Sequence, residues 1–280
     1  MADKIRFFIG TDARGGCAEC RMVLEWSIRK HCSVPFEIID MAISRDPESF
    51  WHGWNTSKWS TPFSGFRYGI AEYCNFEGHV IYQDDDQMWL TDPAEFFALR
   101  DTIPEDKIMT GKIIPTGEIR NCVSLIDCAK WKHLPKTVDP VEVQGVGKFN
   151  KFKEFAGYCD YMKRLTMPMI HVVDGNFNNY DGEQEAIEDI KVLHFTDMST
   201  NPGVKLAVQR LGDQSRHWYD GEIRQHRRPD CVAKFMEYYH EALDAGMRVE
   251  DYIYDEQVEY IKQSQKHYRA NNGFDVTLGQ

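Results

Sequence analysis

The chain has 280 residues, which is enough for one large domain or for a domain with an appendage. Its formal net charge of −11 excludes a basic field over the whole surface, so we expect no nucleic-acid partner. No apolar stretch is long enough to span a bilayer, and the chain enters a strand at once instead of beginning with a signal peptide. We therefore expect a cytoplasmic protein.

Strands and helices alternate along the first 195 residues, which indicates an α/β fold with a mainly parallel or mixed sheet. Short β-branched and aromatic runs predict strands over residues 5–10, 36–39, 79–84, 108–114, 123–126, 170–173 and 192–195. Helical spacing and helix-start signals predict helices over residues 18–31 and 150–164, a helix from Pro62 with Phe63, Phe66, Ile70 and Tyr73 buried, and a helix capped by Asp92. Residues 45–60 predict an aromatic, polar loop.

The pattern changes after about residue 210. Residues 231–245 and 249–268 predict charge-rich amphipathic helices, so we expect a domain over residues 1–210 and a C-terminal helical extension over 211–280. A short basic segment precedes the first of these helices and contains Arg224, His226, Arg227 and Arg228. It is either a solvated loop or a point of peripheral contact with anionic lipid head groups or an anionic glycan.

The strand that begins at His79 ends in three acids, Asp84, Asp85 and Asp86. Three adjacent carboxylates at the end of a buried strand repel one another and cost free energy unless a cation compensates for them. In an extended segment Asp84 and Asp86 point the same way, which offers two hard oxygen ligands to Mn²⁺ or Mg²⁺. The alternative is a solvated turn, because runs of charge are usually exposed.

Two more polar groups follow predicted strands. Thr11, Asp12 and Arg14 come after the first strand, and His194 closes the last one. Ligands bind α/β sheets beyond the carboxyl ends of their strands, so we expect these groups to share an edge with the acid triplet. His194 then becomes a nitrogen ligand for the same cation, although a hydrogen-bonded histidine at a strand end is the common alternative.

Other metal motifs fit the sequence less well. An EF-hand loop counted from Asp84 fails, because Met88 and Trp89 occupy its fifth and sixth positions. A phosphatase of the haloacid-dehalogenase type also has a strand followed by Asp-x-Asp, but Met88 stands where its threonine is expected. Cys17 and Cys20 form half of a zinc site without a second pair at zinc-finger spacing, and we expect the cysteines to be free thiols.

Several segments resemble, in the same order, the GT-A glycosyltransferases and in particular glycosyltransferase family 8 and its bacterial relatives. The segments are residues 5–12, 63–68, 80–86, 90–97, 121–131, 176–180 and 192–197, and the resemblance covers residues 4–205. It implies a GT-A fold over residues 1–210 and transfer of a hexose from a nucleotide sugar, often a UDP-sugar, with retention at the anomeric carbon. In such enzymes Asp84, Asp86 and His194 would hold Mn²⁺ (or Mg²⁺) across the diphosphate.

The resemblance also implies roles in binding the nucleotide sugar. Residues implied in this binding are Thr11, Asp12, Arg14, Arg67, Asp84, Asp85 and Lys205. Asp12 would contact the base or the ribose, and Arg67 would lie at the phosphates or the acid triplet, with an ion pair on a helix surface as its alternative. Lys205 would supply a phosphate-binding cation from a shifted position or be a surface lysine.

Near the anomeric carbon the family's Asp-Gln element has no clean match. Asp160 or Asp174 could stand in as the catalytic group, and the alternative for each is a structural or acceptor-binding role. Among Trp51, Trp54 and Trp59 we expect at least two to be buried and one ring to stack on an acceptor sugar.

The sequence thus predicts a metal-dependent glycosyltransferase with a nucleotide-sugar donor and a glycan, lipid-linked or other hydroxyl acceptor. One alternative is a GT-A scaffold that binds nucleotide or polysaccharide without turnover. The other is a metal-dependent phosphatase, which would release inorganic phosphate instead of a nucleoside diphosphate.

Overall fold

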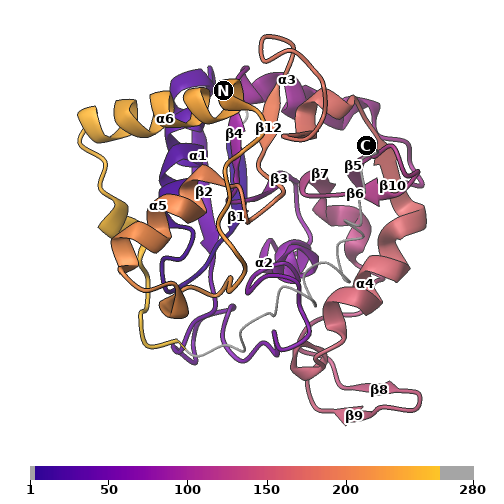
Figure 1. The fold of residues 1–280 in the computed structure, drawn as a ribbon. Helices are drawn as coiled ribbons and strands as arrows, with labels where there is room; N and C mark the ends of the chain where they lie inside the picture. Colours follow the sequence, from indigo (N-terminus) through magenta and orange to yellow (C-terminus); the bar gives the residue numbers. More distant parts are fainter. Residues whose placement is uncertain (1–3, 259–280) are drawn as a thin grey trace.

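The computed structural model describes residues 4–258. Its main sheet has seven strands, six of them in the order β10-β5-β7-β3-β1-β2, with β6 paired to β5 (Figure 1). These strands are β1 (Ile5–Gly10), β2 (Phe36–Met41), β3 (His79–Asp84), β5 (Met109–Ile113), β6 (Ile119–Arg120), β7 (Val123–Asp127) and β10 (Ile170–Val172). β1 is parallel to β2 and β3, whereas β7 is antiparallel to β3 and β5. The expected α/β fold with a mixed sheet is confirmed.

A second sheet of three strands crosses the carboxyl end of β3. It consists of β4 (Gln87–Trp89), β11 (Asn179–Tyr180) and β12 (Val192–His194), with β12 parallel to β11 and antiparallel to β4. A separate hairpin of β8 (Val141–Val143) and β9 (Gly147–Phe149) projects from the rest of the fold (Figure 1).

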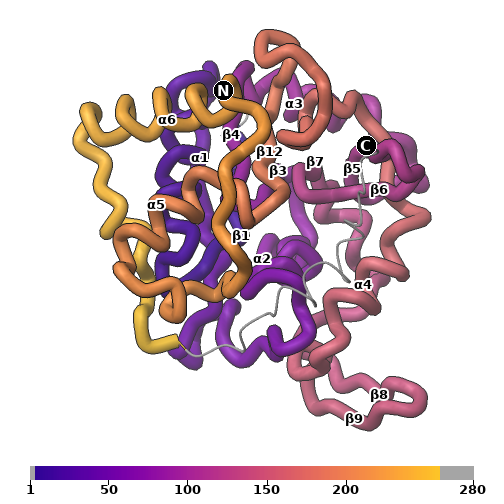
Figure 2. Tube along the Cα trace, in the orientation of Figure 1, coloured from indigo at the N-terminus to yellow at the C-terminus, as the bar shows by residue number. Residues whose placement is uncertain are grey.

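Helices lie on both sides of the main sheet. The α-helices are α1 (Ala18–His31), α2 (Ile70–Tyr73), α3 (Pro93–Ala98), α4 (Tyr158–Thr166), α5 (Pro202–Leu211) and α6 (Pro229–Asp244). Short 3-10 helices are η1 (Phe66–Gly69), η2 (Leu99–Thr102), η3 (Cys128–Trp131), η4 (Phe152–Glu154), η5 (Met167–Met169), η6 (Gly175–Asn178), η7 (Gln214–Arg216) and η8 (Val249–Tyr252). α6 packs beside α1, so the end of the described chain covers its beginning (Figure 2).

The central strands are buried on both faces because their side chains alternate. Phe7 and Ile9 of β1 pack with Leu24 of α1 in one apolar cluster, and Phe8 between them packs into the cluster on the opposite face. Tyr82 of β3 joins Phe8 in that second cluster. These two layers hold the carboxyl ends of β1 and β3 in fixed register.

Several expected elements differ in the structure. The helix from Pro62 begins only at Phe66, as a 3-10 turn, and Tyr73 is 41% exposed instead of buried. The helix over residues 150–164 is η4 followed by a turn, and α4 starts only after Gly157. α5 was not predicted.

The C-terminal segment fits the expectation only in part. α6 confirms the helix over residues 231–245. The helix over residues 249–268 is wrong where the chain is described, because η8 ends at Tyr252 and an irregular segment follows. Residues 259–268 lie outside the described part.

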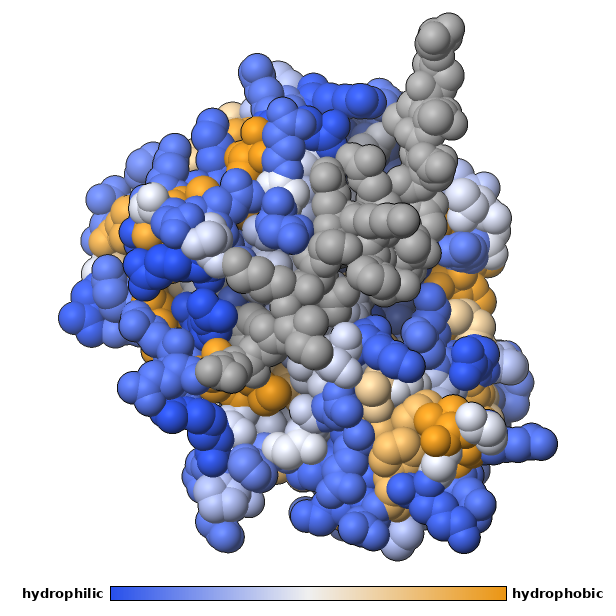
Figure 3. Space-filling view, turned by 60° about the horizontal axis from the view of Figure 1, so that its bottom comes forward, coloured by the Kyte–Doolittle hydropathy of each residue, from blue (hydrophilic) through white to orange (hydrophobic). Residues whose placement is uncertain are grey.

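Figure 3 shows the face that comes forward when the bottom of Figure 1 is turned toward the reader. Its coloured part is mainly hydrophilic, with the broadest apolar area at the lower right and smaller ones elsewhere, including the upper left. Two of the exposed large hydrophobic residues, Val138 and Val146, belong to the hairpin region. Within residues 4–258 no helix has the length and apolar character needed to cross a membrane.

Candidate active site

The acid triplet lies where β3 leaves the main sheet. Gly10 at the end of β1 is in register with Asp84 at the end of β3, so the two parallel strands end at the same edge. β3 ends at Asp84. The next two residues, Asp85 and Asp86, form a turn, and β4 begins at Gln87. The extended geometry expected for the triplet is therefore wrong beyond Asp84.

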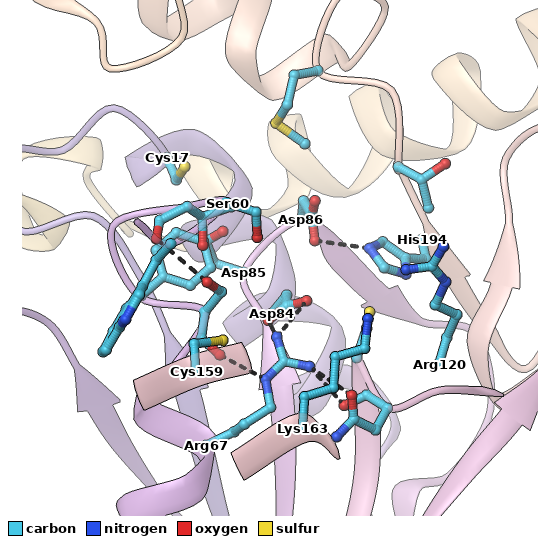
Figure 4. A pocket seen from close by; sticks show the side chains of 18 of the residues that line it. Cys17, Ser60, Arg67, Asp84, Asp85, Asp86, Arg120, Cys159, Lys163 and His194 are labelled. Atoms are coloured by element: carbon cyan, nitrogen blue, oxygen red, sulfur yellow. Dashed lines mark hydrogen bonds and ion pairs between the residues drawn. The ribbon is translucent and has the colours of Figure 1, made fainter. Parts of the chain in front are cut away.

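His194 reaches the triplet through the second sheet. β12 runs antiparallel to β4, which places His194 opposite Gln87, and the backbone N–H of Phe195 donates to the carbonyl of Asp86 at 3.0 Å. His194 and the acids thus both lie at strand ends, as expected, but the acids follow a strand of the main sheet and His194 ends a strand of the second sheet. Their side chains line one pocket (Figure 4). Of the residues predicted for the site, this pocket brings together Arg67, Asp84, Asp85, Asp86, Asp160 and His194.

The carboxylate of Asp84 is paired with the buried guanidinium of Arg67. Arg67 Nη2 donates to Asp84 Oδ1 at 2.9 Å, and the hydroxyl of Tyr82 donates to the same oxygen. The other donors of Arg67 are occupied, with Nε bonded to the carbonyl of Ser64 and Nη1 to that of Asn121. Its guanidinium also lies 4.4 Å from the centre of the Tyr82 ring. Arg67 is thus a buried partner of the triplet and not an exposed ion pair on a helix surface.

Asp85 and Asp86 occupy different surroundings. Asp85 is 1% exposed, and burial followed by repulsion from Asp86 raises the pKa of its carboxyl well above the usual value. Its Oδ2 atom is buried without a hydrogen-bond partner. Asp86 instead faces His194, with 3.2 Å between Asp86 Oδ1 and His194 Nε2. A buried acid of this kind is stable only if it is protonated or if positive charge is brought close to it.

The imidazole of His194 is oriented by a buried amide. Nδ1 lies 2.8 Å from Asn178 Oδ1, which accepts the Nδ1 proton, and this turns Nε2 toward Asp86. Nε2 donates to Asp86 when the ring is protonated and offers its lone pair when the ring is neutral. Burial lowers the pKa of His194, but the neighbouring Asp86 outweighs it and leaves the pKa above its ordinary value. A histidine whose second nitrogen donates to a fixed oxygen is a common metal ligand.

Donor atoms suited to a cation gather around this histidine. One ligand atom each of Asp84, Cys122 and His194 lies within 4.8 Å of the others. Asp86 adds a carboxylate oxygen next to His194, and one oxygen of Asp85 is buried without a hydrogen-bond partner among residues 4–258. These residues fit a divalent metal ion: the carboxylates and the imidazole suit Mn²⁺, while the thiol adds a softer donor.

Cys122 was missed as a site residue. The segment before β7 arrives at the site because β7 is antiparallel to β3, and Asp84 N donates to the carbonyl of Cys122 at 3.2 Å. The signal in the sequence is that Cys122 directly precedes a predicted strand. The direction of that strand, which decides whether Cys122 reaches the site, could not be predicted from the sequence.

Thr11, Asp12 and Arg14 belong to the loop that follows β1. Asp12 Oδ1 accepts from the N–H of Arg14 at 2.9 Å, and Oδ2 accepts from the N–H of Gly16 at 2.8 Å. Burial raises the pKa of Asp12 to about 6, although these N–H groups oppose the rise. Thr11 is also buried, and Arg14 donates to the carbonyl of Arg216 at 3.1 Å. These three side chains do not line the pocket.

Two other predicted residues lie outside the pocket. Lys205 is exposed on α5, whose first turn is capped by Asn201. Asp174 caps η6 by accepting from the N–H of Asn176, and it lies 3.4 Å from the ammonium of Lys191. Asp160 on α4 is the one of the two proposed catalytic carboxylates that lines the pocket.

The aromatic loop is packed inward. Trp51, Trp54 and Trp59 are 6%, 4% and 1% exposed, which confirms that at least two are buried. No ring of the three is exposed for stacking, although Trp59 contributes to the pocket wall. Cys17 and Cys20 are buried free thiols and do not join the group of metal donors found within residues 4–258.

The basic segment before α6 is engaged by the protein itself. Arg224 donates to Ser199 Oγ at 2.7 Å, and Arg228 pairs with Asp230 at 2.5 Å. His226 Nε2 lies 2.9 Å from Asp181 Oδ2, and both side chains are buried. Most of this segment therefore ties the chain after α5 to the rest of the fold.

Comparison with known proteins identifies the fold class. No family model and no curated protein matches the sequence. Among solved structures, the apo form of the glycosyltransferase GlyE from Streptococcus pneumoniae TIGR4 is similar over 89% of this chain and 62% of its own, with a TM-score of 0.52 and 14% identity. The bifunctional glycosyltransferase WbbM is similar over 92% of this chain and 52% of its own, with a TM-score of 0.50 and 10% identity.

The chain therefore has the GT-A-type fold of glycosyltransferases, as the sequence predicted. It spans less than two thirds of either of these proteins. Membership of family 8 stays a prediction.

Proposed function

We propose that the protein is a metal-dependent glycosyltransferase that moves a hexose from a nucleotide sugar, with a UDP-sugar as the first candidate, to a hydroxyl group of a glycan or lipid-linked acceptor. The observation that carries this proposal is the convergence of Asp84, Asp86, Cys122 and His194 in one pocket of a glycosyltransferase fold. Retention at the anomeric carbon is part of the proposal and rests on the resemblance to family 8.

Asp84, Asp86 and His194 would hold Mn²⁺ or Mg²⁺, with Cys122 at the border of the site. When bound, the cation offsets the charge that develops on the departing nucleoside diphosphate. Arg67 keeps the carboxylate of Asp84 in place through its 2.9 Å contact, and Asn178 orients His194. Asp160 is the remaining candidate for a group at the anomeric carbon, because it lines the pocket while Asp174 does not.

The experiment is a binding and hydrolysis screen over nucleotide sugars with Mn²⁺, Mg²⁺ or no metal. We expect metal-dependent binding of one donor and slow release of its nucleoside diphosphate. Asp86→Asn and His194→Ala should each weaken metal-dependent binding by about 100-fold or more, because each removes a ligand. Asp220→Asn is the matched control, since Asp220 is an exposed acid outside the pocket.

Three results would count against the proposal. Absence of metal-dependent binding to every donor would remove the metal site, and binding without any turnover would favour a scaffold that binds nucleotide sugars. Release of inorganic phosphate would favour a phosphatase. Peripheral membrane contact through residues 211–280 stays a separate prediction, to be checked by sedimentation with anionic vesicles.

A further inference from the structure

Two lysines line the pocket, and of these Lys163 is half-buried, whereas Lys58 is exposed. α4 buries Tyr158, Met162 and Thr166 along one side, at a spacing of four residues. The same spacing places Cys159 and Lys163 on a neighbouring stripe, and both line the pocket. Figure 4 shows the side chain of Lys163 extending from α4 into the pocket on the side of Asp84.

The arginines of the pocket wall are already engaged. Arg67 uses its donors on Ser64, Asn121 and Asp84. Arg120 pairs with Glu118, with 2.6 Å between Nη2 and Oε2. For Lys163, in contrast, no hydrogen bond or ion pair of the ammonium is found within residues 4–258.

Lys163 is half-buried, so its ammonium has lost part of its hydration, and among residues 4–258 no carboxylate lies within ion-pair distance of it. Two acids of the pocket are already paired with Arg67 and His194, so this ammonium is placed to bind an anionic ligand. Phosphate oxygens are strong acceptors for an ammonium, and a nucleotide sugar brings two phosphates to this pocket.

We infer that Lys163 binds the diphosphate of the nucleotide sugar, so that the phosphates lie between the acid triplet and α4. This inference rests on the proposed function and names the cation that the site presents to the donor. Lys205, which the resemblance to family 8 implies for this role, is exposed on α5 and does not line the pocket. The phosphate contact would thus come from α4 and not from the segment after His194 that the resemblance implies.

The test measures binding without an acceptor, in the presence of Mn²⁺, for UDP and for uridine as its phosphate-free counterpart. Lys163→Met keeps the length of the side chain and removes the charge. We expect it to weaken binding of UDP by about 10- to 100-fold, the effect of losing one hydrogen bond between charged groups, and to leave uridine binding unchanged. Lys163→Arg should restore most of the affinity, and added salt should weaken UDP binding less in Lys163→Met than in the parent.

Lys205→Met is measured in parallel as the rival assignment. Loss of UDP affinity in Lys205→Met but not in Lys163→Met would overturn the inference, as would equal losses for UDP and uridine in Lys163→Met. Unchanged UDP affinity in Lys163→Met together with a raised KM for the acceptor would assign the lysine to an anionic acceptor instead. If the parent binds another nucleotide sugar but not UDP, both variants are measured with the nucleoside diphosphate and the nucleoside of that donor. If the parent binds no nucleotide sugar, the proposed function fails along with the inference.

Discussion

Asn178 offers a direct test of how His194 is prepared for a metal ion. In the structure Asn178 Oδ1 accepts the proton of His194 Nδ1 at 2.8 Å, and both side chains are buried. In Asn178→Leu, which has a similar volume, Nδ1 loses its acceptor. The ring proton then moves to Nε2, where Asp86 Oδ1 lies 3.2 Å away and accepts it. The lone pair that would bind the metal is lost in this tautomer.

We expect Asn178→Leu to bind Mn²⁺ about 10- to 100-fold more weakly than the parent, the usual effect of removing a partner of a metal-ligating histidine. This corresponds to about 1–3 kcal/mol, which is also the cost of an unsatisfied buried polar group. The Kd is measured by calorimetry or from the electron paramagnetic resonance signal of free Mn²⁺. Thermal unfolding without metal shows whether the fold persists.

Asn178→Asp is the control, because aspartate keeps an oxygen at the position that accepts from Nδ1. It should bind Mn²⁺ within a few-fold of the parent or more tightly, since a carboxylate makes the imidazole a stronger ligand. Equal Mn²⁺ affinity of Asn178→Leu and the parent, with a folded variant, would refute the reasoning about the tautomer. An equal loss in the leucine and aspartate variants would show that packing, not the acceptor, is what the site needs.

Two more predictions concern stability. A Cβ atom at Gly65 would lie 2.4 Å from Trp59 Cζ2, so Gly65→Ala should lower the free energy of unfolding, measured in urea, by about 1–3 kcal/mol. Gly182 has open space around it, so Gly182→Ala should change the free energy of unfolding by less than about 0.5 kcal/mol. Equal effects of the two substitutions would contradict the predicted clash. Burial raises the pKa of Asp12 from 3.8 to about 6, so the folded state binds more protons at this group between these values. The contribution of Asp12 to stability is therefore full below pH 3.8 and is lost as the pH rises through 6. At about 1.36 kcal/mol per pKa unit the loss is about 3 kcal/mol, and Asp12→Asn should flatten this part of the unfolding profile; an unchanged slope would show that another group is responsible.

Local patterns predicted the elements that frame the site. The short β-branched and aromatic run of residues 5–10 predicts β1, which is buried on both faces, and the apolar spacing of residues 18–31 predicts α1, which packs Leu24 against β1. Asp92 was predicted as a cap, and its side chain accepts from the N–H of Ala94. The acid triplet and His194 were singled out because strong charge follows directly after apolar strands.

Strand direction explains most of what the sequence did not reveal. A run of apolar residues predicts β7 but not that β7 is antiparallel to β3, and this direction is what carries Cys122 and Asn121 to the site. α5 could have been predicted, since Asn201 caps the N–H of Gly203 and Pro202 occupies the first turn. No helix was predicted over residues 202–211, and the resemblance to family 8 implied that Lys205 is either a phosphate-binding cation or a surface lysine. The structure places Lys205 on an exposed face of α5.

The three acids of the triplet are not equivalent, and the mixed topology is the reason. A continuous strand would place Asp84 and Asp86 on one face, but the turn after β3 lets each acid meet a different part of the chain. Asp84 meets Arg67 from η1, and Asp86 meets His194 from β12. The charge of Asp84 is thus compensated by an arginine, while the ion-pair partner of Asp86 among residues 4–258 is an imidazole that would itself be a metal ligand. Loss of the metal should therefore affect the surroundings of Asp86 and His194 more than those of Asp84 and Arg67.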